Sequence, residues 1–406
     1  MAQRSQSVSP RARALAGEPV LFLHMPRTAG TTLRSLTQRQ YEPNQVFSLY
    51  TELTSDRIER IHECPPAWLE QVSLVLGHFR FGLHERLPGQ PVYFTMLRDP
   101  VDRVISDYHY ILSNPDHAYH HLVKGRGLSL EDFVRSEDFH FTHNGQARGL
   151  AGLGAVRDRS QLPSDERAAI WQTAMSNLEE HFVFLGLTEE FDKSILIFQD
   201  RLGWKTPYYE VKNVNTSRPR RDPVPESVRS LIAEANAIDI ELYRWAKQQF
   251  DIAVSEGGPG FQQRVEDFQE TNRQLMLAFE TAEQLTSDGE TRAAMDLLES
   301  AIRYEPDCHY VHLAMSVAAR TAGDQERALE HAAHALRLDS FDRRVILHCA
   351  ELLEDSGRVD RAMGLLRFFL ENQNPYDDGV VEVLRSLTGR RRQGFLSLLR
   401  ESERLC

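Results

Sequence analysis

The chain has 406 residues, enough for two or three domains, and its 47 Lys and Arg against 59 Asp and Glu give a formal net charge of -12. Hydrophobic residues at 41% and charged residues at 26% are typical of soluble globular proteins and exclude collagen-like and disordered chains. Residues 1–255 carry 29 Lys and Arg against 32 Asp and Glu, and residues 256–406 carry 18 against 27, so neither half has the basic excess of a nucleic-acid-binding protein.

The N-terminal segment, residues 1–17, is expected to be flexible. It lacks the apolar core of ~7 to 15 residues that a secretory signal contains, and no stretch approaches the roughly 18 consecutive apolar residues of a membrane-spanning helix. The cysteines have neither metal-ligand spacing nor a disulfide pattern: Cys64, Cys308, Cys349 and Cys406. We therefore expect a cytoplasmic protein that is not integral to a membrane and has no metal site.

The first predicted strand, residues 20–24, runs directly into a short loop around Gly30, and a helix-compatible stretch follows at 33–39. A strand, a tight loop and a helix can cradle a phosphate, because the glycine allows close approach and the helix N-terminus presents N–H groups. The candidate anion-binding residues of this cradle are Arg27, Thr28, Ala29, Gly30, Thr31 and Thr32. An ordinary strand-to-helix turn is the alternative.

The cradle loop differs from a Walker A sequence because the lysine expected after the second glycine is absent. A magnesium-dependent kinase or NTPase usually needs that lysine together with an aspartate that holds the metal. The loop therefore fits such an enzyme poorly.

Two histidines, His78 and His84, lie between the cradle and the next predicted strand. An unperturbed histidine pKa of about 6.5 suits proton abstraction near neutral pH, so either could act as a general base. The alternative for each is a loop histidine satisfied by backbone hydrogen bonds.

The second predicted strand, residues 91–97, ends at Arg98, and Ser106 lies eight residues further along in a stretch compatible with a helix. An arginine can grip a phosphate through two N–H groups, and a serine hydroxyl can donate a third bond. Two anion sites at adjacent strand ends fit a nucleotide with two separate phosphate groups.

Both motifs resemble those of the sulfotransferases that use 3'-phosphoadenosine 5'-phosphosulfate (PAPS), and within them the heparan sulfate 6-O- and 2-O-sulfotransferases and their bacterial relatives. Residues 22–32 resemble the 5'-phosphosulfate loop and residues 97–108 the 3'-phosphate motif. Three later segments resemble the 6-O branch in sequence and order: 144–151, 184–189 and 212–217. The resemblance covers about residues 18–255 and implies a sulfotransferase domain with a P-loop-like cradle and a parallel sheet.

The resemblance also implies an activity. A sulfuryl group would pass from PAPS to a hydroxyl, most plausibly of a carbohydrate in a polysaccharide or glycolipid, with no metal required. The animal heparan sulfate enzymes are Golgi membrane proteins, and no membrane anchor is predicted here, so we expect a bacterial origin.

Several residue roles follow from the resemblance alone. Arg98 and Ser106 would hold the 3'-phosphate, and a loop that closes over the nucleotide would contain Asn213, Asn215, Thr216 and Arg218. Arg27 stands where the family usually has a lysine that contacts the bridging oxygen of the leaving group. Arginine keeps the positive charge but cannot donate a proton near neutral pH.

The resemblance leaves both histidines open as the catalytic base. The segment that ends at His84 resembles the catalytic-histidine segment of the 6-O branch, whereas the distance of His78 from Arg98 is closer to that of the 2-O branch. We favour His84 on the sequence. The later stretch 238–243 predicts an amphipathic helix that closes the first domain, with a core role only.

The second half of the chain is repetitive. Gly289, Gly323 and Gly357 are 34 residues apart, and Ala294, Ala328 and Ala362 recur in the same register. Pairs of predicted helices follow this period, as in the tetratricopeptide repeats that the region resembles over about residues 270–375. The array would bind a protein partner or mediate self-association, or it would only pack against the first domain.

The Gly- and Pro-rich stretch 255–260 separates the two halves and places a boundary after residue 255. The sequence thus predicts an α/β sulfotransferase domain over 18–255, followed by an all-α, tetratricopeptide-like domain over 256–406. The alternatives are a nucleotide kinase or NTPase, and a scaffold that acts through its repeats and whose nucleotide domain is impaired by Arg27.

Overall fold

The computed structural model describes residues 9–50, 61, 64–153, 164–205, 207–210, 224–372 and 379–389. The chain forms two compact units, each of which combines segments distant in sequence. Unit 1 comprises Met1–Arg34, Gln45–Pro207 and Val211–Asp267, and unit 2 comprises Ser35–Asn44, Tyr208–Glu210 and Phe268–Cys406.

The domain boundary predicted after residue 255 falls close to a helix end, because α12 spans Ala237–Glu256 and α13 spans Phe261–Ser287. The compact units instead divide within α13, and unit 2 also includes two short segments from the first half of the chain. A linear division of the sequence does not capture these two segments, because only contacts in space assign them.

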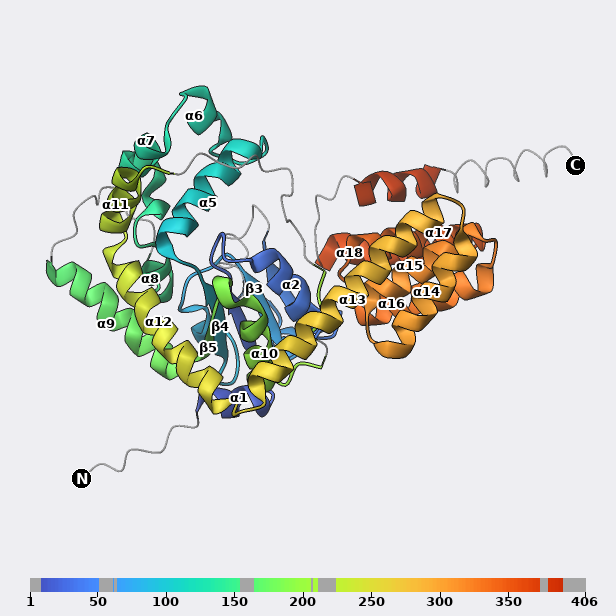
Figure 1. Ribbon diagram of the computed structural model, residues 1–406, viewed down its shortest axis with the longest axis horizontal. Coiled ribbons are helices and arrows are strands. Elements are labelled where there is room, and N and C mark those ends of the chain that lie inside the picture. Colours follow the sequence, from blue (N-terminus) through green and yellow to red (C-terminus); the bar gives the residue numbers. More distant parts are fainter. Residues whose placement is uncertain are drawn as a thin grey trace, which may run out of the picture. The chain divides into compact units, whose positions relative to one another are not determined.

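Unit 1 contains a five-stranded parallel sheet of order β2-β3-β1-β4-β5 (Figure 1). The strands are β1 (Val20–Leu23), β2 (Val46–Leu49), β3 (Leu74–Gly77), β4 (Val92–Leu97) and β5 (Phe182–Leu187). Their runs are almost entirely apolar and buried, as expected of parallel strands covered on both faces. The two strands predicted from the sequence are β1 and β4, which are neighbours in the sheet.

The helices of unit 1 are α1 (Pro10–Leu15), α2 (Gly30–Gln38), α4 (Pro66–Leu69), α5 (Pro100–Ser113), α6 (His120–Gly125), α7 (Leu130–Arg135), α8 (Gly145–Leu150), α9 (Ser164–His181), α10 (Phe191–Leu202), α11 (Glu226–Ala235) and α12. Some of them pack on this sheet and others lie beyond it, and α2 passes from unit 1 into unit 2 after Arg34 (Figure 1). Helices α9, α10 and α12 contact β5, whereas α5, α7 and α11 share a separate hydrophobic cluster (Figure 1). Short 3-10 turns also occur in this half of the chain: η1 (Pro43–Gln45), whose first two residues belong to unit 2, η3 (Leu83–Arg86), η4 (Glu137–Thr142) and η5 (Thr188–Glu190).

Helix α1 corrects one expectation, because it lies inside the segment 1–17 that the sequence analysis expects to be flexible. Ser9 caps the helix by accepting a hydrogen bond from the backbone N–H of Ala12, and Pro10 occupies the first turn, where its missing N–H has no effect. Arg13 also donates a hydrogen bond to the backbone carbonyl of Glu180. These local signals form a helix within a segment that was expected to be flexible.

Six consecutive helices of unit 2 lie within the described range 261–372, the described residues 379–389 are also helical, and the sequence period reflects the turns between the helices. The six helices are α13, α14 (Thr291–Tyr304), α15 (His309–Thr321), α16 (Gln325–Leu338), α17 (Arg343–Asp355) and α18 (Val359–Asn372). Gly289, Gly323 and Gly357 each lie two residues after a helix end with φ of 85°, 83° and 74°, a left-handed conformation that favours glycine.

The alanines that recur in register with these glycines are each fully buried. Each hydrophobic cluster of unit 2 draws on consecutive helices, as expected of a repeat stack. The predicted all-helical second region is therefore confirmed, while its tetratricopeptide assignment stays a prediction. None of the helices in the part of the chain that the structure describes is long and apolar enough to cross a membrane.

Candidate functional site

The loop between β1 and α2 has a strained backbone. Arg27 and Ala29 adopt φ values of 68° and 59°, in the left-handed region that non-glycine residues rarely occupy. Such a conformation costs roughly 1–3 kcal/mol per residue and is enriched at active sites, ligand-binding segments and switch regions. Thr28 is fully buried and its hydroxyl donates a 2.8 Å hydrogen bond to the carbonyl of Met25, which holds the loop closed. The predicted cradle is thus a tight, internally bonded loop at a helix N-terminus.

Gly30, the first residue of α2, lies directly against the ring of His24. A Cβ at position 30 would lie 1.5 Å from Nε2 of His24, so no other residue fits there unless the ring moves. His24 is buried, and burial lowers the pKa of its ring well below the ordinary value, with His78 and nearby arginines acting in the same direction. A neutral histidine therefore packs directly against the glycine of the cradle.

The register of the sheet brings three ring side chains together at the carboxyl edge. Leu23, Gly77 and Leu49 lie side by side at the ends of β1, β3 and β2. The residues that follow them are His24, His78 and Tyr50, whose ring centroids lie 4.4 to 5.4 Å apart. Tyr50 was not among the residues predicted from the sequence, although its place directly after a short apolar run was a usable signal.

His78 has the tautomer that a general base requires. Its Nδ1 lies 3.0 Å from the backbone carbonyl of His24, and because a carbonyl only accepts hydrogen bonds, Nδ1 carries the proton. In the neutral ring, Nε2 then has the lone pair. The side chain is exposed, so an acceptor can reach it.

The surroundings also keep His78 neutral. Although His78 keeps an exposed face, the neighbours packed around its ring replace much of the surrounding water, and this lowers the pKa of His78. The hydrogen bond to the His24 backbone opposes this effect, and the positive charge of Arg34 lowers the pKa further. Arg34 itself lies over the ring of Tyr50, with its guanidinium carbon 4.1 Å from the centroid. His78 is therefore able to accept a proton at neutral pH.

The end of β4 supplies the second predicted anion site. Nη1 of Arg98 donates a 3.1 Å hydrogen bond to the carbonyl of Arg27, and Nε of Arg27 donates one of 3.3 Å to the hydroxyl of Ser106 in α5. The Arg27 guanidinium also lies over the ring of Tyr110, 4.2 Å from its centroid. Arg27, Arg98 and Ser106 are thus brought together, and Tyr110 is a neighbour that the sequence analysis did not select.

His84 lies at the other edge of the sheet. Its Nδ1 is 3.0 Å from the hydroxyl of Tyr93, the second residue of β4, and its ring is 4.4 Å from that of His181, which directly precedes β5. At a strand rise of about 3.3 Å per residue, Tyr93 lies roughly 13 Å from the end of β4, where Arg98 begins the anion site. The structure thus brings His78 to the cradle and leaves His84 at the amino edge.

The remaining predicted cofactor residues fall outside the part of the chain that the structure describes. These are Asn213, Asn215, Thr216 and Arg218. Their closing role stays a prediction.

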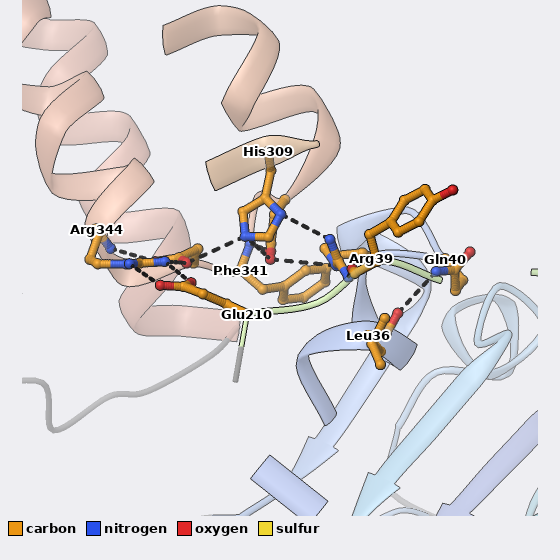
Figure 2. A network of polar contacts seen from close by, with 10 residues as sticks. Leu36, Arg39, Gln40, Glu210, His309, Phe341 and Arg344 are labelled. Carbon is orange, nitrogen blue, oxygen red and sulfur yellow. Dashed lines mark hydrogen bonds and ion pairs between the residues drawn. The ribbon is translucent and has the colours of Figure 1, made fainter. Parts of the chain in front are cut away.

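Unit 2 contains a polar network that was not predicted from the sequence (Figure 2). Within the described residues, one group of potential metal ligands has its atoms within 4.8 Å of one another, namely Glu210, His309 and Asp342. Arg344 already donates hydrogen bonds to both carboxylates, with Nη1 2.8 Å from Oε1 of Glu210.

The histidine of this network is not available as a ligand either. Arg39 donates a 2.8 Å hydrogen bond to Nδ1 of His309, so in the neutral ring Nε2 carries the proton, which faces Asp339 and Asp342 at 3.5 and 3.7 Å (Figure 2). Burial lowers the pKa of His309, and Arg39 lowers it further, so the ring is neutral. Arg39 and Arg344 thus already donate hydrogen bonds to all three residues that could hold a cation.

The carboxyl edge of the sheet thus has the features of an anion-binding α/β protein, with a strained cradle, two arginines and a neutral histidine. A family model described as galactose-3-O-sulfotransferase matches residues 2–294. The chain therefore belongs to the galactose-3-O-sulfotransferase family. The resemblance to sulfotransferases inferred from the motifs is confirmed.

Several characterised sulfotransferases are similar to this chain. Heparan-sulfate 6-O-sulfotransferase 1 of Gallus gallus is 27% identical over 278 residues, which cover 57% of this chain and 66% of the relative. Galactose-3-O-sulfotransferase 3 of Mus musculus is 26% identical over 269 residues, which cover 61% of this chain and 59% of the relative. The chain spans less than two thirds of the length of either relative.

Proposed function

We propose that the protein is a sulfotransferase that moves a sulfuryl group from PAPS to a hydroxyl of a carbohydrate. The observation that carries this proposal is the convergence of Arg27, Arg98 and Ser106 at the carboxyl edge of the sheet, the same edge that carries the neutral His78. Family membership supports the reaction, and the names of the two relatives support a carbohydrate acceptor.

The site would hold the donor at two places. The first turn of α2 offers N–H groups without acceptors inside the helix, together with the hydroxyls of Thr31 and Thr32, and these suit the 5'-phosphosulfate. Arg98 and Ser106 suit the 3'-phosphate. This donor site lies at the carboxyl end of β1. The chain places β2 and β3 on one side of β1 and β4 and β5 on the other, and open parallel sheets bind ligands at such a switch point.

The donor supplies an activated sulfur whose bond to the bridging phosphate oxygen breaks as the acceptor oxygen bonds to sulfur. In the proposed reaction, Nε2 of His78 accepts the proton of the attacking hydroxyl. Arg27 offsets the negative charge that remains on the departing 3',5'-bisphosphate (PAP). Proton, sulfuryl group and leaving group are then all accounted for without a metal.

The sequence favoured His84 as the base, and the geometry leads us to propose His78 instead. His78 follows β3 at the edge where the cradle lies, whereas His84 is bonded to Tyr93 at the opposite edge. A general base must lie within hydrogen-bond reach of the proton that it removes. On this proposal His84 has a structural role.

A thermal unfolding scan with PAP, with ATP plus magnesium, and with no ligand tests the donor. A ligand at ~100 times its dissociation constant stabilises the folded state by about 2.7 kcal/mol, so PAP should raise the melting temperature. Arg98→Ala is the matched control and should remove most of that rise. Stabilisation by ATP plus magnesium alone would support a kinase, and no response to either ligand would support a non-catalytic scaffold.

A further inference from the structure

The main chain of Arg98 is held from both sides by one buried side chain. Oε1 of Gln146 accepts a 3.0 Å hydrogen bond from the Arg98 N–H, and Nε2 of Gln146 donates one of 3.0 Å to the Arg98 carbonyl. Gln146 is 1% exposed, so water does not compete for these bonds. β4 ends at Leu97, and Gln146 of α8 provides hydrogen bonds to the peptide groups just beyond it.

Gln146 is fixed in turn by a buried carboxylate. Oδ2 of Asp239 accepts a 3.1 Å hydrogen bond from the Gln146 N–H, and Oδ1 accepts one of 2.7 Å from the Ala147 N–H. Asp239 has no exposed surface, and burial raises the pKa of its carboxyl group, while Arg103 and these hydrogen bonds lower it. Because both carboxyl oxygens accept hydrogen bonds from the first turn of α8, the start of this helix is fixed to α12.

Asn144 completes a reciprocal arrangement between α8 and α12. Its Oδ1 accepts hydrogen bonds of 2.9 and 3.2 Å from the N–H groups of Ile238 and Asp239, at the start of α12. Each helix therefore supplies the side chain that caps the other. This corrects the expectation that residues 238–243 have only a core role, because an amphipathic pattern does not reveal a buried polar pair.

The side chain of Arg98 is also tied, through its 3.1 Å hydrogen bond to the carbonyl of Arg27. Its main chain and its guanidinium are therefore both fixed before any ligand arrives. A bidentate contact between arginine and phosphate depends on such geometry, and misplacement of the fork weakens both bonds together.

We infer that Gln146 is a positioning residue for Arg98, and that Asp239, acting through Gln146, sets the selectivity of the site for a nucleotide with a 3'-phosphate. The inference rests on the proposed function, because it takes Arg98 as the 3'-phosphate ligand. Loss of Gln146 then weakens binding only of nucleotides that carry this phosphate.

The test compares two probes, PAP and adenosine 5'-phosphosulfate, which lacks the 3'-phosphate. The dissociation constant of each is measured by calorimetry for the wild type and for Gln146→Ala. We expect Gln146→Ala to weaken PAP binding about tenfold, the loss typical of one strong polar contact, and to leave adenosine 5'-phosphosulfate within about twofold. Asp239→Asn, which turns one acceptor into a donor, should shift the same ratio in the same direction by less.

Asn177→Ala is the matched control. Nδ2 of Asn177 donates a 2.8 Å hydrogen bond to the carbonyl of Leu150, at the other end of α8, so this variant removes a similar bond from the same helix. It should lower the melting temperature without changing the ratio of the two affinities.

Equal losses for both probes in Gln146→Ala, or an unchanged ratio in both Gln146→Ala and Asp239→Asn, would overturn the inference and reduce Gln146 to a structural role. A wild type that binds both probes equally well would instead overturn the 3'-phosphate site itself, and with it the donor assignment of the proposed function. The two failures are therefore distinguishable.

Discussion

The two edges of the central sheet carry histidines with different hydrogen-bond partners and different neighbours. At the carboxyl edge, His78 is exposed, keeps its Nε2 lone pair and lies in the group of residues that follow β1, β2 and β3. At the amino edge, His84 is half-buried between Tyr93 and His181, with its Nδ1 bonded to the tyrosine. Two histidines six residues apart in the chain therefore have different chemical capacities.

The contrast shows that strand direction decides which residues of a parallel sheet lie at the ligand-binding edge. Every strand in the described part of the sheet ends at the same edge, so the cradle, Arg98 and His78 meet there even though they come from separate motifs. The segment from His78 to His84 leaves that edge and returns to the start of β4, where side chains pack and bond to one another. The predictions below test this division, beginning with the largest expected effect.

Replacing each histidine by alanine should give the largest difference in activity between the two edges. His78→Ala should lower the rate of sulfuryl transfer by about 10²- to 10⁴-fold, the usual contribution of a general base, and should leave PAP affinity nearly unchanged. His84→Ala should keep most of the activity. Transfer from labelled PAPS to heparan sulfate and to galactose-terminated oligosaccharides is the measurement.

The opposite pattern, with activity lost in His84→Ala and kept in His78→Ala, would contradict the proposal and restore the preference drawn from the sequence. Activity that survives in both variants would remove the histidines from catalysis altogether.

Arg98→Ala should remove the strongest charged contact of the carboxyl edge. Hydrogen bonds to charged groups contribute roughly 1.5–3 kcal/mol, so PAP affinity should fall about 10- to 150-fold. Arg86→Ala, which removes a charge from η3 beside His84, is the control and should change PAP affinity little. Similar effects of the two variants would mean that general charge, and not the strand end, binds the nucleotide.

His348, a buried histidine of unit 2, has no proposed role in the reaction, so its titration should change only the stability of the fold. Burial and Arg320 lower the pKa of His348 to about 4, so its folded-state pKa lies below its unfolded value. The unfolded chain then binds the extra proton, and stability present at neutral pH is lost as the pH falls from about 6.5 to 4. At pH 5 the loss should be about 2 kcal/mol.

Urea unfolding of the wild type and of His348→Gln at pH 7 and pH 5 measures this loss. Glutamine can still donate a hydrogen bond to Ser316, as His348 does over 2.8 Å, but it does not titrate. The variant should therefore lose less stability than the wild type on acidification, while its transfer rate stays unchanged. Equal acid sensitivity of the two proteins would show that His348 titrates freely.

The pH dependence of transfer gives the smallest effect. Because the pKa of His78 is lowered, the acid limb of kcat/KM should have its midpoint below about 6.5, with activity falling as the pH drops through it. Arg34→Gln removes a charge that lowers this pKa and should move the midpoint upward. A midpoint that does not respond to Arg34 would point to a different titrating group.

Much of the carboxyl edge could be predicted from the sequence. The apolar runs of β1 and β4 and the residues directly after them identified the cradle, Arg98 and Ser106, because strand ends follow from local patterns. The choice between His78 and His84 could not be made, since it depends on register and on a hydrogen bond to the backbone of His24. The support from Gln146 and Asp239 was also hidden, because it joins residues more than ninety positions apart.

The most direct measurement of the central claim is a crystal structure with PAP bound. The account predicts the 5'-phosphate at the first turn of α2 and the 3'-phosphate within hydrogen-bond distance of Arg98 and Ser106. It also predicts an open path from the 5'-phosphate to Nε2 of His78. A nucleotide bound at the amino edge, beside His84 and Tyr93, would contradict it.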